Sequence, residues 1–174
     1  MVVSLSELLS NEKELEALIT CFKCSRDKDV ENFLKKSAIA CEKSGEARTF
    51  IYFEDKKKRD GKTEIDGFFT LALKAFYIRK EAVDVNIEKG KPFPAYLIGQ
   101  LARADWSEKG VGERLLRLAV QYIKTAQIYV GGYFAYLDCK ENLVSYYEKF
   151  GLKYFQDRKK TNDGTALKQM YMLI

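Results

Sequence analysis

The stretch that decides the fold is LIGQLARADWSEKGVGERLL, residues 97–116. It begins as an apolar run typical of a buried strand, passes through a short polar turn, and enters a helical pattern at Gly110 and Gly112. The first turn of a helix carries backbone N–H groups without intrahelical partners and the positive end of the helix dipole. Glycine has no Cβ, so a phosphate can approach the backbone closely. The stretch therefore predicts an anion-binding turn, and the alternative is an ordinary strand–helix turn that contains two glycines.

Length and composition indicate one soluble domain. The chain has 174 residues, of which 47% are hydrophobic and 13% aromatic, enough to bury a full-sized core. We therefore expect a single domain over residues 1–174. No apolar stretch approaches the roughly 18 residues that span a bilayer, and the first residues carry no basic region ahead of an apolar one. A cytoplasmic protein without membrane contact is expected.

Four cysteines and the absence of histidine limit the chemistry. Cys21 and Cys24 have the spacing of half a zinc site, but the sequence offers no second half. We expect reduced, mostly buried thiols and no metal. Without histidine, Ser-His-Asp and Cys-His catalysis are excluded, as is the usual general base. Any catalysis must use another residue type.

The remaining sequence alternates between helical and strand patterns. Residues 1–20 are helical or mixed, Asp27 is placed to cap a helix that Gly45 ends, and further helices are expected at 110–127 and 141–150. Strands are expected at 49–53, 65–73, 97–103, 133–137, 153–155 and 170–174. Turns are expected in the charged loop 56–62 and at 162–164, and Pro92 and Pro94 mark a pause in regular structure. This order predicts an α/β (α+β) fold with a sheet of mixed direction.

Two basic clusters accompany the net charge of +5. They are Lys56-Lys57-Lys58-Arg59 and Arg158-Lys159-Lys160. Such clusters are most often solvated turns, but they can also supply the sequence-independent attraction that holds a polyanion. Contact with RNA or DNA is therefore one of two interpretations.

At these residues the chain resembles the GNAT family of acetyl-coenzyme-A-dependent N-acetyltransferases. The family signature is Gln or Arg, two residues, Gly, one residue, and Gly or Ala, and it corresponds here to Ser107-Glu108-Lys109-Gly110-Val111-Gly112, with Ser107 departing from it. A second mark is Tyr146-Tyr147-Glu148-Lys149-Phe150-Gly151-Leu152, with Leu152 in place of Phe. In the family, the tyrosine at the place of Tyr147 commonly protonates the departing thiolate of coenzyme A. The Asn that many members carry seven residues earlier is Lys140 here.

The resemblance extends to the GNAT toxins of bacterial toxin–antitoxin pairs, which acetylate the amino group of aminoacyl-tRNA. The similar segments are Phe22-x-Cys24, Phe33-Leu34, Ala47-Arg48-Thr49-Phe50, Gly67-Phe68-Phe69-Thr70-Leu71 and Gly99-Gln100-Leu101-Ala102. The likeness runs from about residue 22 to the end. It implies a GNAT fold, in which a mixed, mostly antiparallel twisted sheet is flanked by helices and splayed at the acetyl-CoA strand.

The resemblance also implies a role for each part of the site. Acetyl-CoA is the expected co-substrate, with its pantetheine arm and thioester on Leu101, Ala102 and Arg103 and its pyrophosphate on Glu108, Lys109, Gly110, Val111, Gly112 and Glu113. Tyr147 is the expected acid, whereas Tyr146 faces away and packs. Phosphates of a tRNA acceptor are expected on Lys56, Lys57, Lys58, Arg59, Arg158, Lys159 and Lys160, with Arg103 as a further candidate. Expected partners are a small DNA-binding antitoxin and a second copy of the chain.

The acceptor stays open between three hypotheses. It is aminoacyl-tRNA, or the amine of a small molecule or protein, or there is none and the protein is a non-catalytic acyl-CoA sensor, as the departures at Ser107 and Lys140 allow. An acceptor ammonium must lose a proton before attack, and Glu64 or Asp66 could take it, although carboxylates in a hairpin are usually only solvated. An α-amino group titrates near pH 8, roughly, and such an acceptor needs no dedicated base.

Overall fold

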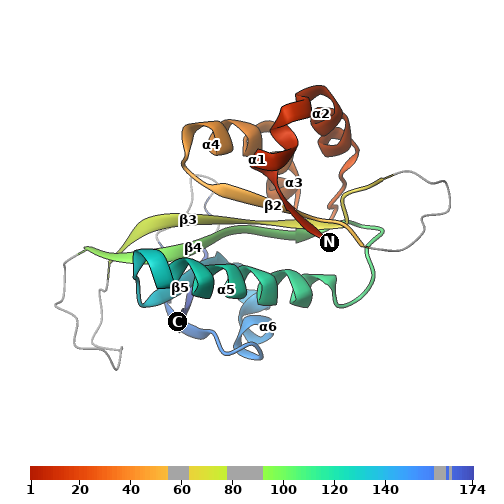
Figure 1. The fold of residues 1–174 in the computed structure, drawn as a ribbon. Coiled ribbons are helices and arrows are strands. Elements are labelled where there is room, and N and C mark those ends of the chain that lie inside the picture. The colour runs from red at the N-terminus through yellow and green to blue at the C-terminus, as the bar shows by residue number, and fades with distance from the viewer. Residues whose placement is uncertain (55–62, 78–91, 159–163, 165) are drawn as a thin grey trace. The chain divides into compact units, whose positions relative to one another are not determined.

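The computed structural model describes residues 1–54, 63–77, 92–158, 164 and 166–174. Its elements, labelled in Figure 1, fall into two compact units. The first comprises Met1–Ala72 and Gly99–Gln121, and the second comprises Leu73–Ile98 and Tyr122–Ile174. Three elements contribute to both units: β3 (Gly67–Tyr77), β4 (Pro92–Arg103) and α5 (Val111–Val130). Each unit is therefore assembled from segments that are far apart in the sequence.

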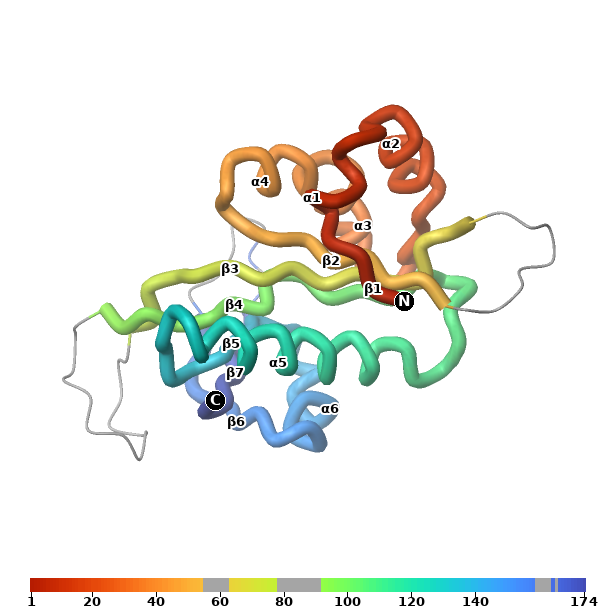
Figure 2. The backbone as a smooth tube through the Cα atoms, viewed as in Figure 1, coloured from red at the N-terminus to blue at the C-terminus, as the bar shows by residue number. Residues whose placement is uncertain are grey.

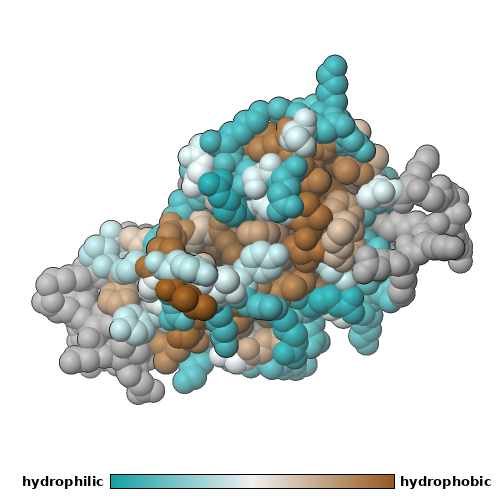
Figure 3. Space-filling view, in the orientation of Figure 1, coloured by the Kyte–Doolittle hydropathy of each residue, from teal (hydrophilic) through white to brown (hydrophobic). Residues whose placement is uncertain are grey.

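Helices make up most of the first 44 residues. After the short strand β1 (Val2–Ser4) come α1 (Leu5–Leu8), the 3-10 turn η1 (Leu9–Asn11), α2 (Glu12–Cys21), α3 (Lys28–Lys36) and α4 (Ala38–Ser44). Helices α1 to α4 lie on one side of β2 (Arg48–Tyr52) in Figure 1, and hydrophilic side chains line their outward edge in Figure 3. The helical expectation for residues 1–20 is confirmed, except that the chain starts as a strand.

The helix expected between Asp27 and Gly45 is two helices. Asp27 caps α3 as predicted, because its carboxylate accepts hydrogen bonds from the N–H groups of Asp29 and Val30, and Gly45, with φ 77°, ends α4. The single-helix prediction was wrong at Ser37, where φ is −121° and the helix breaks. The break has a tertiary reason, since α4 then buries Glu42, whose carboxylate accepts the N–H of Thr49 at 2.8 Å.

The first unit buries one apolar core beneath these helices. β2 pairs antiparallel with β1 and with β3, and Ile51 of β2 lies directly opposite Phe68 of β3. Both side chains are fully buried against residues of the helices and of the segment that follows α2. The main members of this core are Leu5, Leu15, Ile19, Phe22, Leu34, Ala38, Ile51, Phe68 and Ala104.

The second unit has an aromatic core. It adds β5 (Phe134–Cys139), η2 (Glu141–Leu143), α6 (Val144–Glu148), β6 (Lys153–Asp157) and β7 (Lys168–Leu173), whose path can be followed in Figure 2. β5 runs parallel to β4 and antiparallel to β7, which also pairs with β6. The buried side chains that share this core are Phe76, Ala95, Phe134, Tyr136, Phe155 and Tyr171.

The strands form one sheet in the order β1-β2-β3-β4-β5-β7-β6, which confirms the predicted α/β fold with a mixed, mostly antiparallel sheet. Pairing between β4 and β5 ends at Leu97 and Tyr136, although β5 continues to Cys139, as a splayed sheet requires. The pause expected at Pro92 and Pro94 was wrong, because both are exposed residues at the start of β4. A strand tolerates proline at its start, where the missing N–H breaks no ladder.

Several remaining expectations concern single residues. All four cysteines are free thiols, as expected, but only Cys24 and Cys139 are buried. Within the described ranges, no cluster of three or more His, Cys, Asp or Glu side chains is placed to hold a metal ion, and no helix is long and apolar enough to cross a membrane. The charged loop 56–62 and residues 162 and 163 of the expected turn lie outside the described residues.

Candidate active site

The turn that leads into α5 has the geometry of an anion site. Gly110 has φ 101°, a backbone conformation that side-chain-bearing residues rarely adopt, and no atom lies within 4 Å of the position its Cβ would occupy. The first helical hydrogen bond runs from the N–H of Arg114 to the carbonyl oxygen of Gly110, at 3.0 Å. The N–H of Val111 donates to the carbonyl of Glu108 at 3.4 Å, whereas the N–H groups of Gly112 and Glu113 precede the first helical bond and have no partner four residues back in the helix. They lie at the positive end of a 20-residue helix.

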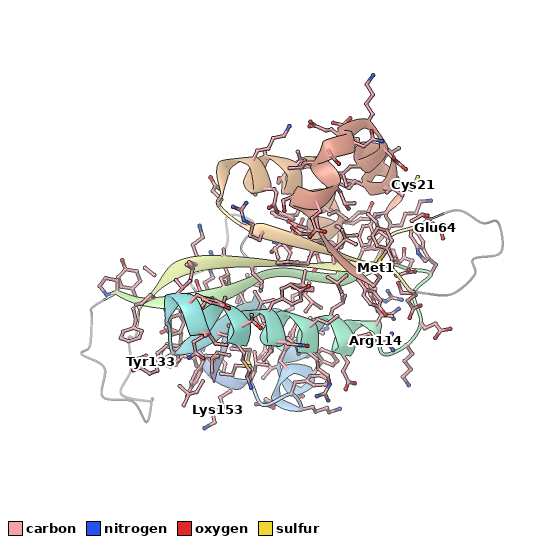
Figure 4. All side chains as sticks on the ribbon, in the orientation of Figure 1. Met1, Cys21, Glu64, Arg114, Tyr133 and Lys153 are labelled. Carbon is pink, nitrogen blue, oxygen red and sulfur yellow. The ribbon has the colours of Figure 1, made fainter. Side chains whose placement is uncertain are left out.

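The charges around this turn are compatible with a bound phosphate. Lys109 is exposed, and the carboxylate of Glu113 is paired with the guanidinium of Arg117 at 2.9 Å, which offsets its repulsion of an anion. Arg114 adds a cation on the first turns of α5 (Figure 4) and donates to the Tyr52 hydroxyl at 2.5 Å. Of the expected pyrophosphate residues, Gly110 leaves room for such a group and Gly112 and Glu113 offer N–H donors, whereas Glu108 adds an exposed carboxylate.

Ser107, the residue that departs from the family signature, holds the turn in place. Its side chain is nearly buried and its hydroxyl donates to the main-chain carbonyl of Asp66. The same carbonyl accepts the N–H of Ala104 at 2.8 Å, and Arg103 donates to the carbonyl of Ser107 at 2.9 Å. Arg103, a candidate for phosphate or substrate contact, thus has a structural bond of its own. A serine here fixes the backbone of the turn from inside.

Asp66 is a structural residue in this arrangement. It is 2% exposed, and its carboxylate accepts the N–H of Glu54 at 2.8 Å. Its own N–H donates to the carbonyl of Tyr52 at 2.9 Å. These bonds argue against the expectation that Asp66 takes a proton from the acceptor. Glu64 is partly exposed.

The segment after α2 anchors the same turn from another side. The ring of Phe22 packs edge-on against Phe68 and Trp106, with centroids 5.5 and 6.4 Å apart. The carboxylate of Asp105 accepts two hydrogen bonds from Ser25, one from its N–H at 3.1 Å and one from its side-chain hydroxyl at 2.9 Å. Burial alone would raise the pKa of Asp105, but these bonds hold it below its usual value. The Phe22-x-Cys24 segment, which resembles the toxins, is therefore part of a region that contacts this turn.

The end of β4 is held by an unusual side-chain bond. The N–H of Gln100 donates to the hydroxyl oxygen of Thr70, at 2.9 Å. Of the expected pantetheine residues, Ala102 is buried in the core, while Leu101 and Arg103 are half-buried on the other face of the strand. Sequence reasoning missed the roles of the Thr70 hydroxyl and the Asp66 carbonyl, although it named Asp66 as a possible base and residues 67–71 as similar to the toxins.

Tyr147 lies in the second unit, on α6. Its side chain is 8% exposed, and its hydroxyl has no hydrogen bond to another described residue. Burial, followed by the neighbouring Cys139 and Tyr146, raises the pKa of Tyr147 well above its usual range. The phenol is therefore neutral at any physiological pH and can donate a proton. Tyr146 packs against Phe150 with centroids 5.0 Å apart, as its expected packing role requires.

The basic clusters are described only in part. Lys56, Lys57, Lys58, Arg59, Lys159 and Lys160 lie outside the described residues. Arg158 lies in the second unit, where its guanidinium pairs with the carboxylate of Asp138 at 2.6 Å and stays 55% exposed. Lys140, which stands where the family has Asn, is exposed.

Comparison with solved structures identifies the fold. The chain is similar to the toxin–antitoxin complex AtaTR bound with acetyl-CoA (TM-score 0.67, 16% identity, 99% of this chain and 92% of that chain). It is also similar to a variant of KacT with one tyrosine replaced by phenylalanine (TM-score 0.69, 16% identity, 89% and 86%). A third is AtaT complexed with acetyl-methionyl-tRNAfMet (TM-score 0.66, 19% identity, 86% and 85%). These neighbours are toxin-type GNAT acetyltransferases, so the chain has the GNAT fold. No protein-family model and no curated protein matches the sequence significantly.

Proposed function

We propose that this protein is an acetyl-CoA-dependent N-acetyltransferase. The observation that carries the proposal is the left-handed Gly110 followed by the N–H groups of Gly112 and Glu113 at the start of α5. Such a turn accommodates the pyrophosphate group of coenzyme A, because the N–H donors and the helix dipole act on this anion together. The solved structure of AtaTR with bound acetyl-CoA supports acetyl-CoA as the molecule that carries this pyrophosphate.

The main chain of β4 would hold the rest of the co-substrate. Leu101, Ala102 and Arg103 offer strand N–H and carbonyl groups for a pantetheine arm and the thioester carbonyl. Acetyl-CoA supplies an activated acyl group that an amine can attack directly. Fixed backbone donors stabilise the negative charge that develops on the carbonyl oxygen during the attack.

Tyr147 is the residue that we assign as the general acid. A buried phenol with a raised pKa stays protonated, and its hydroxyl has no competing acceptor among the described residues. A thiolate that leaves during acyl transfer has a pKa of about 8.5, well below that of this tyrosine. Proton transfer from this phenol to a free thiolate is uphill, so donation must occur in concert with C–S cleavage, as negative charge develops on the sulfur.

The acceptor that we propose is the α-amino group of an aminoacyl-tRNA. The AtaT complex with acetyl-methionyl-tRNAfMet supports it, as does the net charge of +5. Asp66 is occupied in structural hydrogen bonds, and an α-amine that titrates near pH 8 (roughly) needs no strong base. By the same analogy we propose a small antitoxin as a protein partner, since AtaT and AtaR form such a pair. Self-association remains a prediction that size-exclusion chromatography with light scattering would test.

The first test measures acetyl transfer from radiolabelled acetyl-CoA to charged total tRNA. Tyr147→Phe removes only a hydroxyl, so the fold should persist while kcat falls by about 100-fold or more. The matched control is Tyr146→Phe, the neighbouring tyrosine, which should retain nearly full activity. Label in small amines or protein but not in tRNA would refute the acceptor. Equal rates for Tyr147→Phe and the wild type would refute the role of Tyr147, and no transfer to any amine would refute the enzyme.

A further inference from the structure

A small pocket opens in the second unit on the face of β5 opposite Tyr147. Alternation along the strand places Tyr136 and Asp138 on one face and Cys139, the neighbour of Tyr147, on the other. The pocket has a volume of about 220 Å³. The residues that line it are Ala75, Phe76, Tyr77, Tyr136, Gln156, Asp157, Arg158 and Gln169.

The volume of this pocket limits what it can hold. Sites for drug-sized molecules usually measure roughly 300–1,000 Å³, so 220 Å³ suits a single end group rather than a whole metabolite or a helix. An end group of a longer molecule would leave the remainder outside, along the surface.

The carboxylates at the pocket are already engaged, which argues against a cationic ligand. Asp138 accepts from Arg158 at 2.6 Å and from the amide of Gln169 at 3.2 Å. Asp157 accepts from Lys168 and from the hydroxyl of Tyr154, both at 2.8 Å. An ammonium group of a polyamine or lysine would have to displace one of these donors. The pocket is therefore poorly suited to a lysine side chain.

The groups that remain available suit an aromatic, anion-bearing end group. Tyr136 lines the pocket and is 7% exposed, and its hydroxyl makes no hydrogen bond to another described residue. Tyr77 is 52% exposed and can present a ring face at the rim. The guanidinium of Arg158 is 55% exposed and uses one of its two terminal nitrogens on Asp138, which leaves N–H donors for a phosphate. Ring faces, a hydroxyl and a guanidinium are groups with which proteins bind unpaired nucleotides.

We propose that this pocket binds the base of the 3′-terminal nucleotide of an RNA acceptor, with Tyr136 donating to that base and the exposed guanidinium of Arg158 donating to the phosphate of the same nucleotide. The proposal rests on the proposed function, because an aminoacyl group is esterified to that nucleotide. Arg158 thus contacts the 3′ end of the RNA specifically, in addition to the general attraction that a basic cluster exerts on RNA. Tyr77 packs against the ring, and the rest of the RNA lies outside the pocket.

Binding of short RNA tests the pocket without any acetyl transfer. The probe is an eight-nucleotide single-stranded RNA with a 5′ fluorophore, compared with the same RNA carrying a 3′-phosphate that alters its end. We expect the wild-type protein to bind the RNA with a free 3′ end more tightly than the RNA with a 3′-phosphate. Tyr136→Phe and Arg158→Gln should each weaken binding of the RNA with the free end by about tenfold, so that both RNAs bind equally. The matched controls, Tyr133→Phe and Lys153→Gln, change an exposed tyrosine and an exposed cation of the same unit (labelled in Figure 4) and should change the Kd less than about twofold.

The outcomes separate this proposal from the proposed function. Unchanged binding in Tyr136→Phe and Arg158→Gln, or equal affinity for both RNA ends, would overturn the pocket even if tRNA is acetylated. End-specific binding that depends on both residues supports the pocket even if no acetyl group is transferred, in which case only the enzymatic proposal fails. Calorimetric titration with acetyl-CoA should give the same Kd for all four variants, which shows that each is folded.

Discussion

Glu31 joins three groups around the segment that follows α2. Its carboxylate accepts the N–H of Cys24 at 2.8 Å and the ammonium groups of Lys28 and Lys35 at 2.9 and 3.0 Å. These bonds, led by the one from Cys24, lower the pKa of Glu31 to about 2. A folded-state pKa below the unfolded value means that the ionised carboxylate stabilises the fold, and that protonation removes this stabilisation.

Stability should therefore depend on pH through Glu31. Glu31→Gln should lower the free energy of unfolding by about 1–3 kcal/mol at pH 7. The stabilisation is complete above the unfolded pKa of about 4.3 and is lost as the pH falls towards about 2, so the two proteins should converge in that window. Urea unfolding from pH 7 to pH 3 measures this difference. Glu16→Gln, at an exposed position on α2, serves as the control, and a difference that stays constant with pH would contradict the role of Glu31.

Three elements meet at Gly67, where β3 begins. A Cβ added there would lie 2.8 Å from the carbonyl oxygen of Ala102 on β4 and 2.7 Å from a methyl carbon of Leu115 on α5. The side chain of Leu115 can rotate, but the carbonyl is part of the backbone. Glycine at this position thus allows β4 and α5 to approach the start of β3.

Substitution of Gly67 tests this approach. Gly67→Ala should lower the free energy of unfolding by about 1–3 kcal/mol, because the backbone of β4 must shift. Gly45→Ala is the comparison, since its Cβ meets no atom within 4 Å and only the left-handed φ of 77° opposes it, at a cost of about 1 kcal/mol. Chemical denaturation of both variants measures the difference. A smaller effect at Gly67 than at Gly45 would contradict the steric explanation.

At the scale of the whole molecule, continuous elements connect the two units. β3, β4 and α5 each contribute residues to both, so neither unit contains a complete set of its own strands and helices. We therefore predict one cooperative unfolding transition, as a single domain over residues 1–174 requires.

The single tryptophan makes this prediction testable. Trp106 belongs to the first unit, whereas Phe134 is fully buried in the core of the second. Phe134→Leu should lower the unfolding midpoint seen by Trp106 fluorescence and by far-UV circular dichroism equally. A midpoint of Trp106 fluorescence that does not move in this variant would mean that the units unfold separately.

Local patterns predicted most of the elements because they depend on neighbouring residues. The capping carboxylate of Asp27, the left-handed Gly45 and the apolar runs around Ile51 and Phe134 act over a few residues, and each is where the sequence indicated. The break at Ser37 was missed because the contact that favours it, between Glu42 and the N–H of Thr49, depends on the packing of α4 on β2.

The site was predictable to a similar extent. The turn at Gly110 follows from glycine spacing, and its left-handed φ of 101° adds a second reason for glycine there, whereas phosphate binding stays a prediction. The roles of Ser107 and Asp66 were not predictable, because a hydroxyl and a main-chain carbonyl that lie 41 positions apart leave no local pattern. Whether Tyr147 acts as an acid and Arg158 contacts RNA stay predictions.

The loop between β4 and α5 is attached to the protein through Asp66, Ser25 and Phe22, as well as through its own ends. Its backbone therefore loses conformational entropy when the chain folds, and not when an anion arrives. Ligands that meet an already ordered loop retain more of their interaction energy as affinity. For this protein, the affinity for a phosphate would then depend on the contacts that order the loop during folding. Substitutions that remove such contacts would weaken phosphate binding even where the substituted side chain does not touch the ligand.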